Sequence, residues 1–185
     1  GPLKLEFLPS TSEEDAVQIS IDTQSQAVTT EKTAGKPSTF QLLKRELNKQ
    51  SAPANALVTF SFGAYDPELL QSDWTTFSGY FNTVKEFLME QTRLPLFKLE
   101  YDVIVGLFQA DSKAILESKL ISLNALSKPQ LITVGQKSFP LNLRLGYVML
   151  EQGLQDEIHC NTLIAQAFST PLPQAEVASE FKLDI

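Results

Sequence analysis

The stretch Ala56-Leu57-Val58-Thr59-Phe60-Ser61-Phe62 decides the fold. It is rich in β-branched and aromatic residues, and it lies between Pro53 and Gly63, two residues of the kind that interrupts regular structure. A short apolar run bounded by such residues is typical of a buried strand. We therefore predict that residues 56–62 form the central strand of a sheet.

Four helices are predicted around this strand, because apolar residues recur there at helical spacing between polar cap residues and prolines. Ser38 or Thr39 caps the first helix, and Asp111 or Ser112 caps the third. The apolar stripe of the second helix is expected to pack against the sheet through Phe81, Val84 and Leu88. The predicted helices cover residues 39–52, 74–92, 112–128 and 154–168.

Two hairpins complete the pattern of elements. Glu100-Tyr101-Asp102 separates strands at 96–99 and 103–108, and Gly135-Gln136-Lys137 separates strands at 131–134 and 139–149. Paired strands with helices between them favour an α+β fold, in which helices flank a mostly antiparallel sheet. We expect the central sheet to contain residues 56–62, 96–99, 103–108 and 141–148.

The chain is predicted to have three parts. Gly1-Pro2 resembles the remnant of a cleaved affinity tag, and residues 1–37 are interpreted as this remnant followed by a polar linker. Residues 16–21 alternate between apolar and polar like a short edge strand, although plain disorder explains them nearly as well. Residues 38–170 are the predicted folded domain, and residues 171–185 are a C-terminal tail.

Composition excludes several classes of protein. The 185 residues include 15 basic and 22 acidic side chains, and the net charge of −7 argues against a dedicated nucleic-acid binder. No apolar run is long enough to span a membrane. Cys160 is the only cysteine and His159 the only histidine, so a disulfide framework, a zinc site and a catalytic triad are poorly supported. A lone thiol suits a reducing compartment, and we predict a cytoplasmic location.

Few residues are candidates for metal chemistry. Asp66 and Asp73 bracket a proline-containing loop and could hold a divalent cation, but two such acids are more often helix caps. Glu100 and Asp102 are better explained as exposed turn residues than as ligands. His159 and Cys160 have no further ligand near them in the sequence, so packing is the favoured interpretation.

The order of elements over about residues 38–168 resembles the GGDEF domain, the diguanylate cyclase fold that condenses two GTP into cyclic di-GMP. Residues 56–65 resemble the first strand of the family and its Asp-x-Asp-x-Phe-Lys turn. Residues 98–105 resemble the signature hairpin, which reads Arg-Leu-Gly-Gly-Asp-Glu-Phe in the family. Residues 143–146 are similar to the later strand that usually ends Ser-x-Gly, and residues 160–168 to the final helix.

Residues that the family uses to bind metal and guanine are replaced in this chain. Ser61 and Gly63 stand where the resemblance places the acids of the first turn, and neither can replace a carboxylate ligand near a triphosphate. Asp66 stands at the lysine of that turn and would repel phosphate. Leu69 and Ser78 stand at the guanine-binding positions.

The signature hairpin is degenerate as well. Of its acids only Asp102 remains, since Val103 follows it, and a charged and a bulky residue replace the two glycines. The degenerate hairpin comprises Glu100, Tyr101, Asp102, Val103 and Ile104.

Two further sites of the family are lost. Phe168 stands at the phosphate-binding lysine of the last helix. The inhibitory Arg-x-x-Asp that binds cyclic di-GMP in the family aligns with Gln91 and Leu94, and Arg93 is out of register.

The resemblance therefore implies an inactive GGDEF-like domain, with no catalytic residue, no metal site and no cofactor. We predict a regulatory or protein-interaction module of a bacterial protein, connected with cyclic di-GMP signalling, biofilm, secretion or motility. The predicted partner is another protein, a neighbouring domain of the same chain or a second copy. The alternative is a sensor that binds GTP or cyclic di-GMP weakly without turnover. An enzyme of unrelated chemistry is the least supported hypothesis.

The former nucleotide cleft is predicted to be an interaction surface, because large apolar groups stand where a cyclase keeps small and polar ones. Such groups are enriched at protein interfaces. Filling of the vacated cleft as core is an equally weighted alternative. The residues expected around the cleft are Tyr65, Leu69, Leu70, Trp74 and Tyr101.

Overall fold

A computed structural model describes residues 35–63, 66–100 and 102–175 of the chain. The predicted edge strand at 16–21 and the residues Tyr65 and Tyr101 lie outside this part. Two compact units are distinguished, Gly1–Gln41 and Leu42–Ile185, and the second contains all the strands described below. None of the helices within the described ranges is long and apolar enough to cross a membrane.

Within the described residues, the central sheet has four strands in the order β3-β4-β2-β7. Its strands are β2 (Ala54–Ser61), β3 (Leu96–Glu100), β4 (Val103–Ala110) and β7 (Arg144–Met149). Every neighbouring pair is antiparallel, and β2 lies between β4 and β7. The predicted α+β fold with an antiparallel sheet is confirmed, and so is the strand at residues 103–108.

One predicted strand is divided into two. Residues 139–149 were expected to form a single strand, but they form the end of β6 (Lys137–Leu141) and the whole of β7. Among the strands that the structure describes, β6 pairs only with β5 (Gln130–Val134) in a separate two-stranded sheet, whereas β7 joins the central sheet beside β2. Asn142 and Leu143 connect the two strands, so residues 141–143 do not belong to the central sheet.

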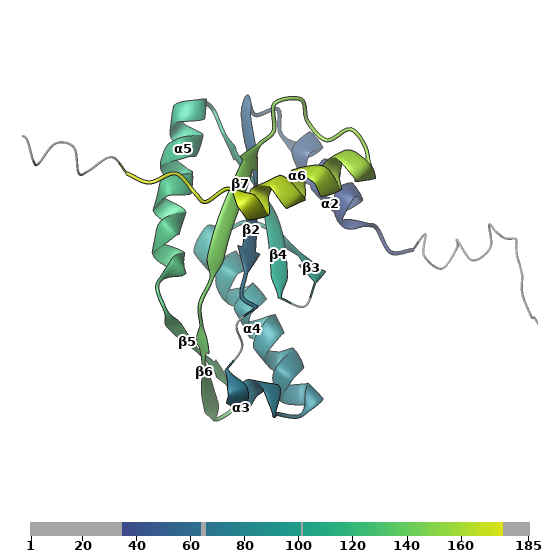
Figure 1. Cartoon of the computed structure of the whole chain (residues 1–185). Helices are drawn as coiled ribbons and strands as arrows, with labels where there is room; N and C mark the ends of the chain where they lie inside the picture. Colours follow the sequence, from purple (N-terminus) through teal and green to yellow (C-terminus); the bar gives the residue numbers. More distant parts are fainter. Residues whose placement is uncertain (1–34, 64–65, 101, 176–185) are drawn as a thin grey trace, which may run out of the picture. The chain divides into compact units, whose positions relative to one another are not determined.

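Helices α4 (Trp74–Thr92) and α5 (Lys113–Ser122) cover one face of the sheet, and α6 (Glu157–Ser169) crosses the other (Figure 1). The boundaries of α4 agree with the sequence prediction. Helix α5 continues into a 3-10 turn, η1 (Leu123–Ser127), and α6 begins three residues later than predicted because the carboxylate of Asp156 caps it. The remaining helices are α2 (Thr39–Lys49) and α3 (Pro67–Leu70).

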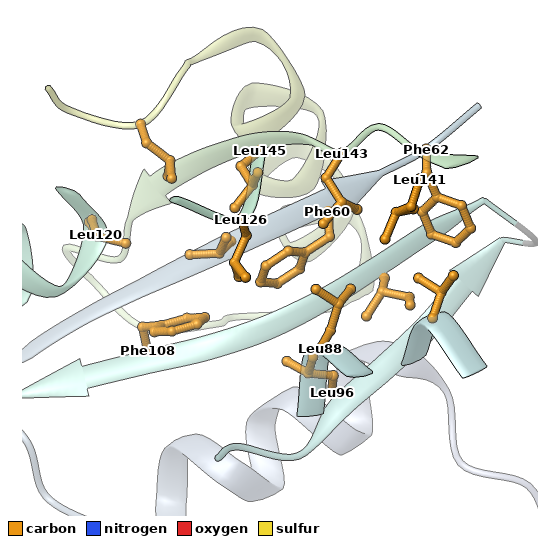
Figure 2. Packing of buried hydrophobic residues seen from close by; sticks show 14 of the residues in the cluster. Phe60, Phe62, Leu88, Leu96, Phe108, Leu120, Leu126, Leu141, Leu143 and Leu145 are labelled. Carbon is orange, nitrogen blue, oxygen red and sulfur yellow. The ribbon is translucent and has the colours of Figure 1, made fainter. Parts of the chain in front are cut away.

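Side chains that alternate along β2 divide the interior into two layers. Ala56, Val58 and Phe60 face α4 and α5, where the main hydrophobic cluster of the described residues lies (Figure 2). Phe81, Val84 and Leu88 of α4 belong to this cluster, as predicted. On the opposite face, α6 approaches β7 so closely that a Cβ on Gly146 would lie 1.9 Å from the carbonyl oxygen of Ala167.

Candidate functional site

The end of β2 and the β3–β4 hairpin lie side by side. Ser61 is paired with Val103 in the antiparallel register, and the Phe62 amide donates a hydrogen bond to the Asp102 carbonyl at 3.1 Å. A Cβ built on Gly63 would be 3.0 Å from Oδ2 of Asp102. Ser61, Gly63, Asp102 and Val103, which the resemblance places at the catalytic centre of a cyclase, are therefore neighbours in this fold.

These neighbouring positions offer little to a metal ion. Asp102 supplies a carboxylate, while the Ser61 hydroxyl donates to the Arg144 carbonyl at 3.3 Å, and Val103 is a buried apolar residue. Hard divalent cations prefer several oxygen ligands, usually with more than one carboxylate. Within residues 35–63, 66–100 and 102–175, no group of three or more histidine, cysteine, aspartate or glutamate side chains is placed to hold a metal.

The acids of the loop between β2 and α4 cap helices. Asp66 accepts a hydrogen bond from the Glu68 amide at 3.0 Å and begins α3, in which Pro67 occupies the first helical position. Asp73 accepts from the Thr76 amide at 2.8 Å and begins α4. The hydrogen bonds from Thr76 hold the pKa of Asp73 below its usual value. The structure thus gives both carboxylates the capping role that the sequence favoured over a cation site.

The predicted interaction surface is only partly exposed. Leu69 is fully buried in the main hydrophobic cluster, so it belongs to the core and not to a surface. It is inward-facing because α3, a short helix that sequence reasoning missed, turns it toward the sheet. Leu70 and Trp74 are exposed by 58% and 61%. The Trp74 ring lies 6.1 Å from that of Phe77, between ring centroids.

The remaining hairpin residues have ordinary structural environments. Ile104 is buried in the main cluster, whereas Glu100 is exposed at the end of β3. The register between β3 and β4 shifts between Lys98 and Glu100, so the hairpin contains an irregularity next to its tip.

His159 and Cys160 both serve the folded structure. The Asp156 carboxylate accepts from the His159 amide at 2.8 Å, and Nδ1 of the His159 ring accepts from the Gln155 amide at 3.1 Å. The first bond satisfies an amide of the first turn of α6, and the second satisfies the amide of the residue before the cap. Cys160 is buried, and burial, followed by the nearby Glu157 carboxylate, raises the pKa of its thiol.

Sequence reasoning missed one feature entirely, a hollow of about 420 Å³ between the end of α4 and α5. Gln91 and Leu94, which align with the family's inhibitory site, are among its lining residues. Phe168 lies elsewhere, half-buried on α6. The signal that could have revealed the hollow is the difference in length between β3 and β4.

Comparison with known proteins finds a similar structure but no match in sequence. No protein-family model matches the chain, and no curated protein matches it in sequence. The crystal structure of the FimX GGDEF domain from Pseudomonas aeruginosa matches with a TM-score of 0.53 and 13% sequence identity. The match covers 70% of this chain and 82% of that one. The chain has a GGDEF-like fold. The likeness concerns the GGDEF-like architecture alone, since so low an identity carries no function across.

Proposed function

We propose that this chain is a GGDEF-fold domain that does not synthesise cyclic di-GMP and acts instead as a regulatory or protein-interaction module in a bacterial protein. The observation that carries the proposal is the composition of the aligned catalytic positions. Ser61, Gly63, Asp102 and Val103 are brought together, yet only Asp102 contributes a carboxylate. Phosphoryl transfer depends on metal ions that bridge and neutralise phosphate oxygens, and one carboxylate is a poor substitute for a metal-binding set.

The buried position of Leu69 supports the same proposal. The resemblance to the GGDEF family aligns Leu69 with a guanine-binding position. In this structure the Leu69 side chain is fully buried in the hydrophobic cluster. An apolar side chain offers no hydrogen bond to a base edge. A site built on such a residue would leave polar groups of the base unpaired, which costs affinity.

The cyclase part of the proposal is tested by incubating the protein with GTP and Mg²⁺ or Mn²⁺ and separating the products by chromatography. We expect no cyclic di-GMP above a control without protein. Turnover that disappears in Asp102→Ala would overturn the proposal. Calorimetric titration with GTP and with cyclic di-GMP, each with and without Mg²⁺, identifies the alternative, because a sensor would bind one of them without converting it.

The interaction part rests on two exposed apolar side chains that are close in the sequence, Leu70 at the end of α3 and Trp74 at the start of α4. Large exposed aromatic and aliphatic groups are typical of recognition surfaces. We expect Leu70→Ala and Trp74→Ala to weaken self-association or partner binding while the melting temperature changes little. Ile158→Ala is a matched control, because Ile158 is 78% exposed on a different helix, α6.

Sedimentation velocity beside thermal melts decides between an interface and a core role. Weaker association of the Leu70 and Trp74 variants, with the Ile158 variant unchanged, supports the interface. Unchanged association combined with a large fall in melting temperature removes it, because that is the behaviour of residues that only fill space.

A further inference from the structure

One edge of the central sheet is covered for only half its length. Strand β4 runs from Val103 to Ala110, but its pairing with β3 ends at Leu96 and Gly106. The residue before Leu96 is Pro95, which has no amide hydrogen to donate to the next position of β4. Among the described residues, no strand lies beside the outer edge of Leu107–Ala110.

The hydrogen-bonding groups of this edge can be assigned from the ladder. The Asp102 carbonyl accepts from Phe62, which continues β2, so even-numbered residues of β4 direct their backbone groups toward β2. Leu107 and Gln109 therefore direct theirs outward. The side chain of Lys119 confirms this direction, because its Nζ donates to the Gln109 carbonyl at 3.0 Å.

A groove follows the open edge. The hollow of about 420 Å³ and a second hollow of about 210 Å³ meet there and share Gln50, Gln109 and Lys119. One side of the groove is apolar, because Leu94 and Leu123 pack against the main cluster to which Phe108 belongs. Gln50 and Gln109 are polar residues of the lining, and the Gln109 side-chain amide donates to Oδ1 of Asn55 at 2.7 Å.

We propose that this edge binds an extended peptide segment of a partner protein as an added strand beside Leu107–Ala110. Main-chain hydrogen bonds to an exposed sheet edge supply affinity, and alternate side chains of the peptide supply specificity. The groove has apolar and amide-bearing lining residues, so it suits a peptide in which apolar and polar residues alternate. This proposal concerns a surface separate from Leu70 and Trp74, and it stands without the proposed function.

Lys119 gives the groove a preference for acidic peptides. A docked strand would donate one of its own amides to the Gln109 carbonyl and displace the Lys119 ammonium from it. The released ammonium would then lie beside the peptide, where a carboxylate side chain is its natural partner. Lys119 is the one charged residue that lines the larger hollow, whereas Asp111 joins Lys119 in the lining of the smaller one, so the preference belongs to the larger hollow.

A second copy of this chain is a poor occupant, because the edge is recessed. Residues that follow α2, the end of α4 with Leu94, and residues of α5 line the groove along β4. Two copies facing each other would present the same concave surface, so the walls would meet before the two strands could pair. A single extended strand has the shape that enters such a groove.

The probe for this proposal is a fluorescein-labelled hexapeptide with the sequence Thr-Val-Glu-Val-Thr-Val and blocked ends, added to the whole chain and followed by fluorescence anisotropy. Its control is the same peptide with alternate amides N-methylated, which cannot form the ladder. We expect saturable binding of the unmodified peptide and affinity weaker by about tenfold or more for the methylated one, as the loss of backbone hydrogen bonds implies.

Two variants test the edge directly. Gln109→Pro removes the outward amide and keeps the inner ladder, so it should weaken binding by about tenfold. Lys119→Gln should abolish the preference for the Glu peptide over its Gln counterpart, whereas Lys113→Gln, on the same helix outside the groove, should not. In hydrogen exchange followed by NMR, the Gln109 amide should become protected when peptide is added.

Several results would overturn the proposal. They are the absence of saturable binding at millimolar peptide, equal binding of the methylated peptide, and an unchanged exchange rate at Gln109. Self-association of the chain that is lost in Gln109→Pro would assign the edge to a second copy and also contradict the proposal. Because Lys119→Gln and the exchange measurement leave the strand intact, the test remains decisive if Gln109→Pro does not fold.

Discussion

Substitution of Gly146 by alanine tests how tightly α6 is packed on the sheet. A Cβ at this position would lie 1.9 Å from the carbonyl oxygen of Ala167 and 3.0 Å from the carbonyl oxygen of Thr170. Carbon–oxygen contacts in proteins are normally no closer than about 3.3 Å, so the shortfall at Ala167 is about 1.4 Å. Both oxygens are backbone atoms at the end of α6, and a change of rotamer cannot relieve the clash.

The loss of stability expected for Gly146→Ala follows from the backbone atoms of α6 that must move. Overpacking in a well-packed interior usually costs about 1–3 kcal/mol, and a rigid backbone clash of this size belongs at the upper limit. We expect Gly146→Ala to lower the free energy of unfolding by about 3 kcal/mol, even after the entropic advantage of alanine over glycine in a strand. For a unit of this size, the melting temperature should fall by about 10 °C.

Urea unfolding followed by circular dichroism measures the effect. Gly135→Asn is the matched control, because Gly135 has a positive φ of 66°, a Cβ there meets nothing within 4 Å, and asparagine tolerates this conformation. The control should stay within about 1 kcal/mol of the parent chain. If Gly146→Ala were as stable as the parent, the close approach of α6 to β7 would be refuted.

Three further outcomes are expected. Leu116→Ala, at a fully buried position of α5, should cost about 2–5 kcal/mol, whereas Ile115→Ala, at a half-exposed position beside it, should cost less than about 1 kcal/mol by urea titration. Asp73→Ala should destabilise the chain at neutral pH. Because the Thr76 hydrogen bonds lower the pKa of Asp73, this contribution exists above the carboxyl's unfolded-state pKa and should vanish as the pH falls through its folded-state pKa. Burial raises the pKa of Cys160, so its thiol should react slowly with a thiol reagent in the native chain and rapidly in urea.

Elements with strong local signals could be predicted from the sequence. The long helix at 74–92 has both an apolar stripe and a capping acid, and its boundaries are reproduced. The strands at 96–100 and 103–110 are marked by apolar runs on either side of turn residues, and they form the expected hairpin. In each case the deciding interactions lie within a few residues of one another.

Elements decided by distant contacts could not be predicted as well. The apolar alternation continues from Phe139 through Leu145, so nothing local divides β6 from β7. The division arises because Leu141 pairs with Gln130 while Leu145 pairs with Phe60. Leu69 is a similar case, since α3 has only four residues and its burial depends on tertiary packing.

The candidate site was predicted in part. The resemblance to the GGDEF family aligned catalytic positions with Ser61, Gly63, Asp102 and Val103. The structure places these residues together. The open edge of β4 was not foreseen, although the predicted strands at 96–99 and 103–108 already differ in length. Whether another element covers such an edge depends on tertiary packing, which the residues of the edge do not reveal.

The central place of β2 has a consequence for biosynthesis. The chain is made from its N-terminus, so β2 leaves the ribosome before either strand that flanks it, and β7 follows only after α3, α4, α5 and the strands β3 to β6. Pairings between segments so far apart in sequence form slowly, because a long loop must close before any contact is gained. Until then Ala56–Phe60 is an apolar segment with strong β propensity and no charge. The strand that organises the finished sheet is therefore the part of the nascent chain that most needs protection from aggregation.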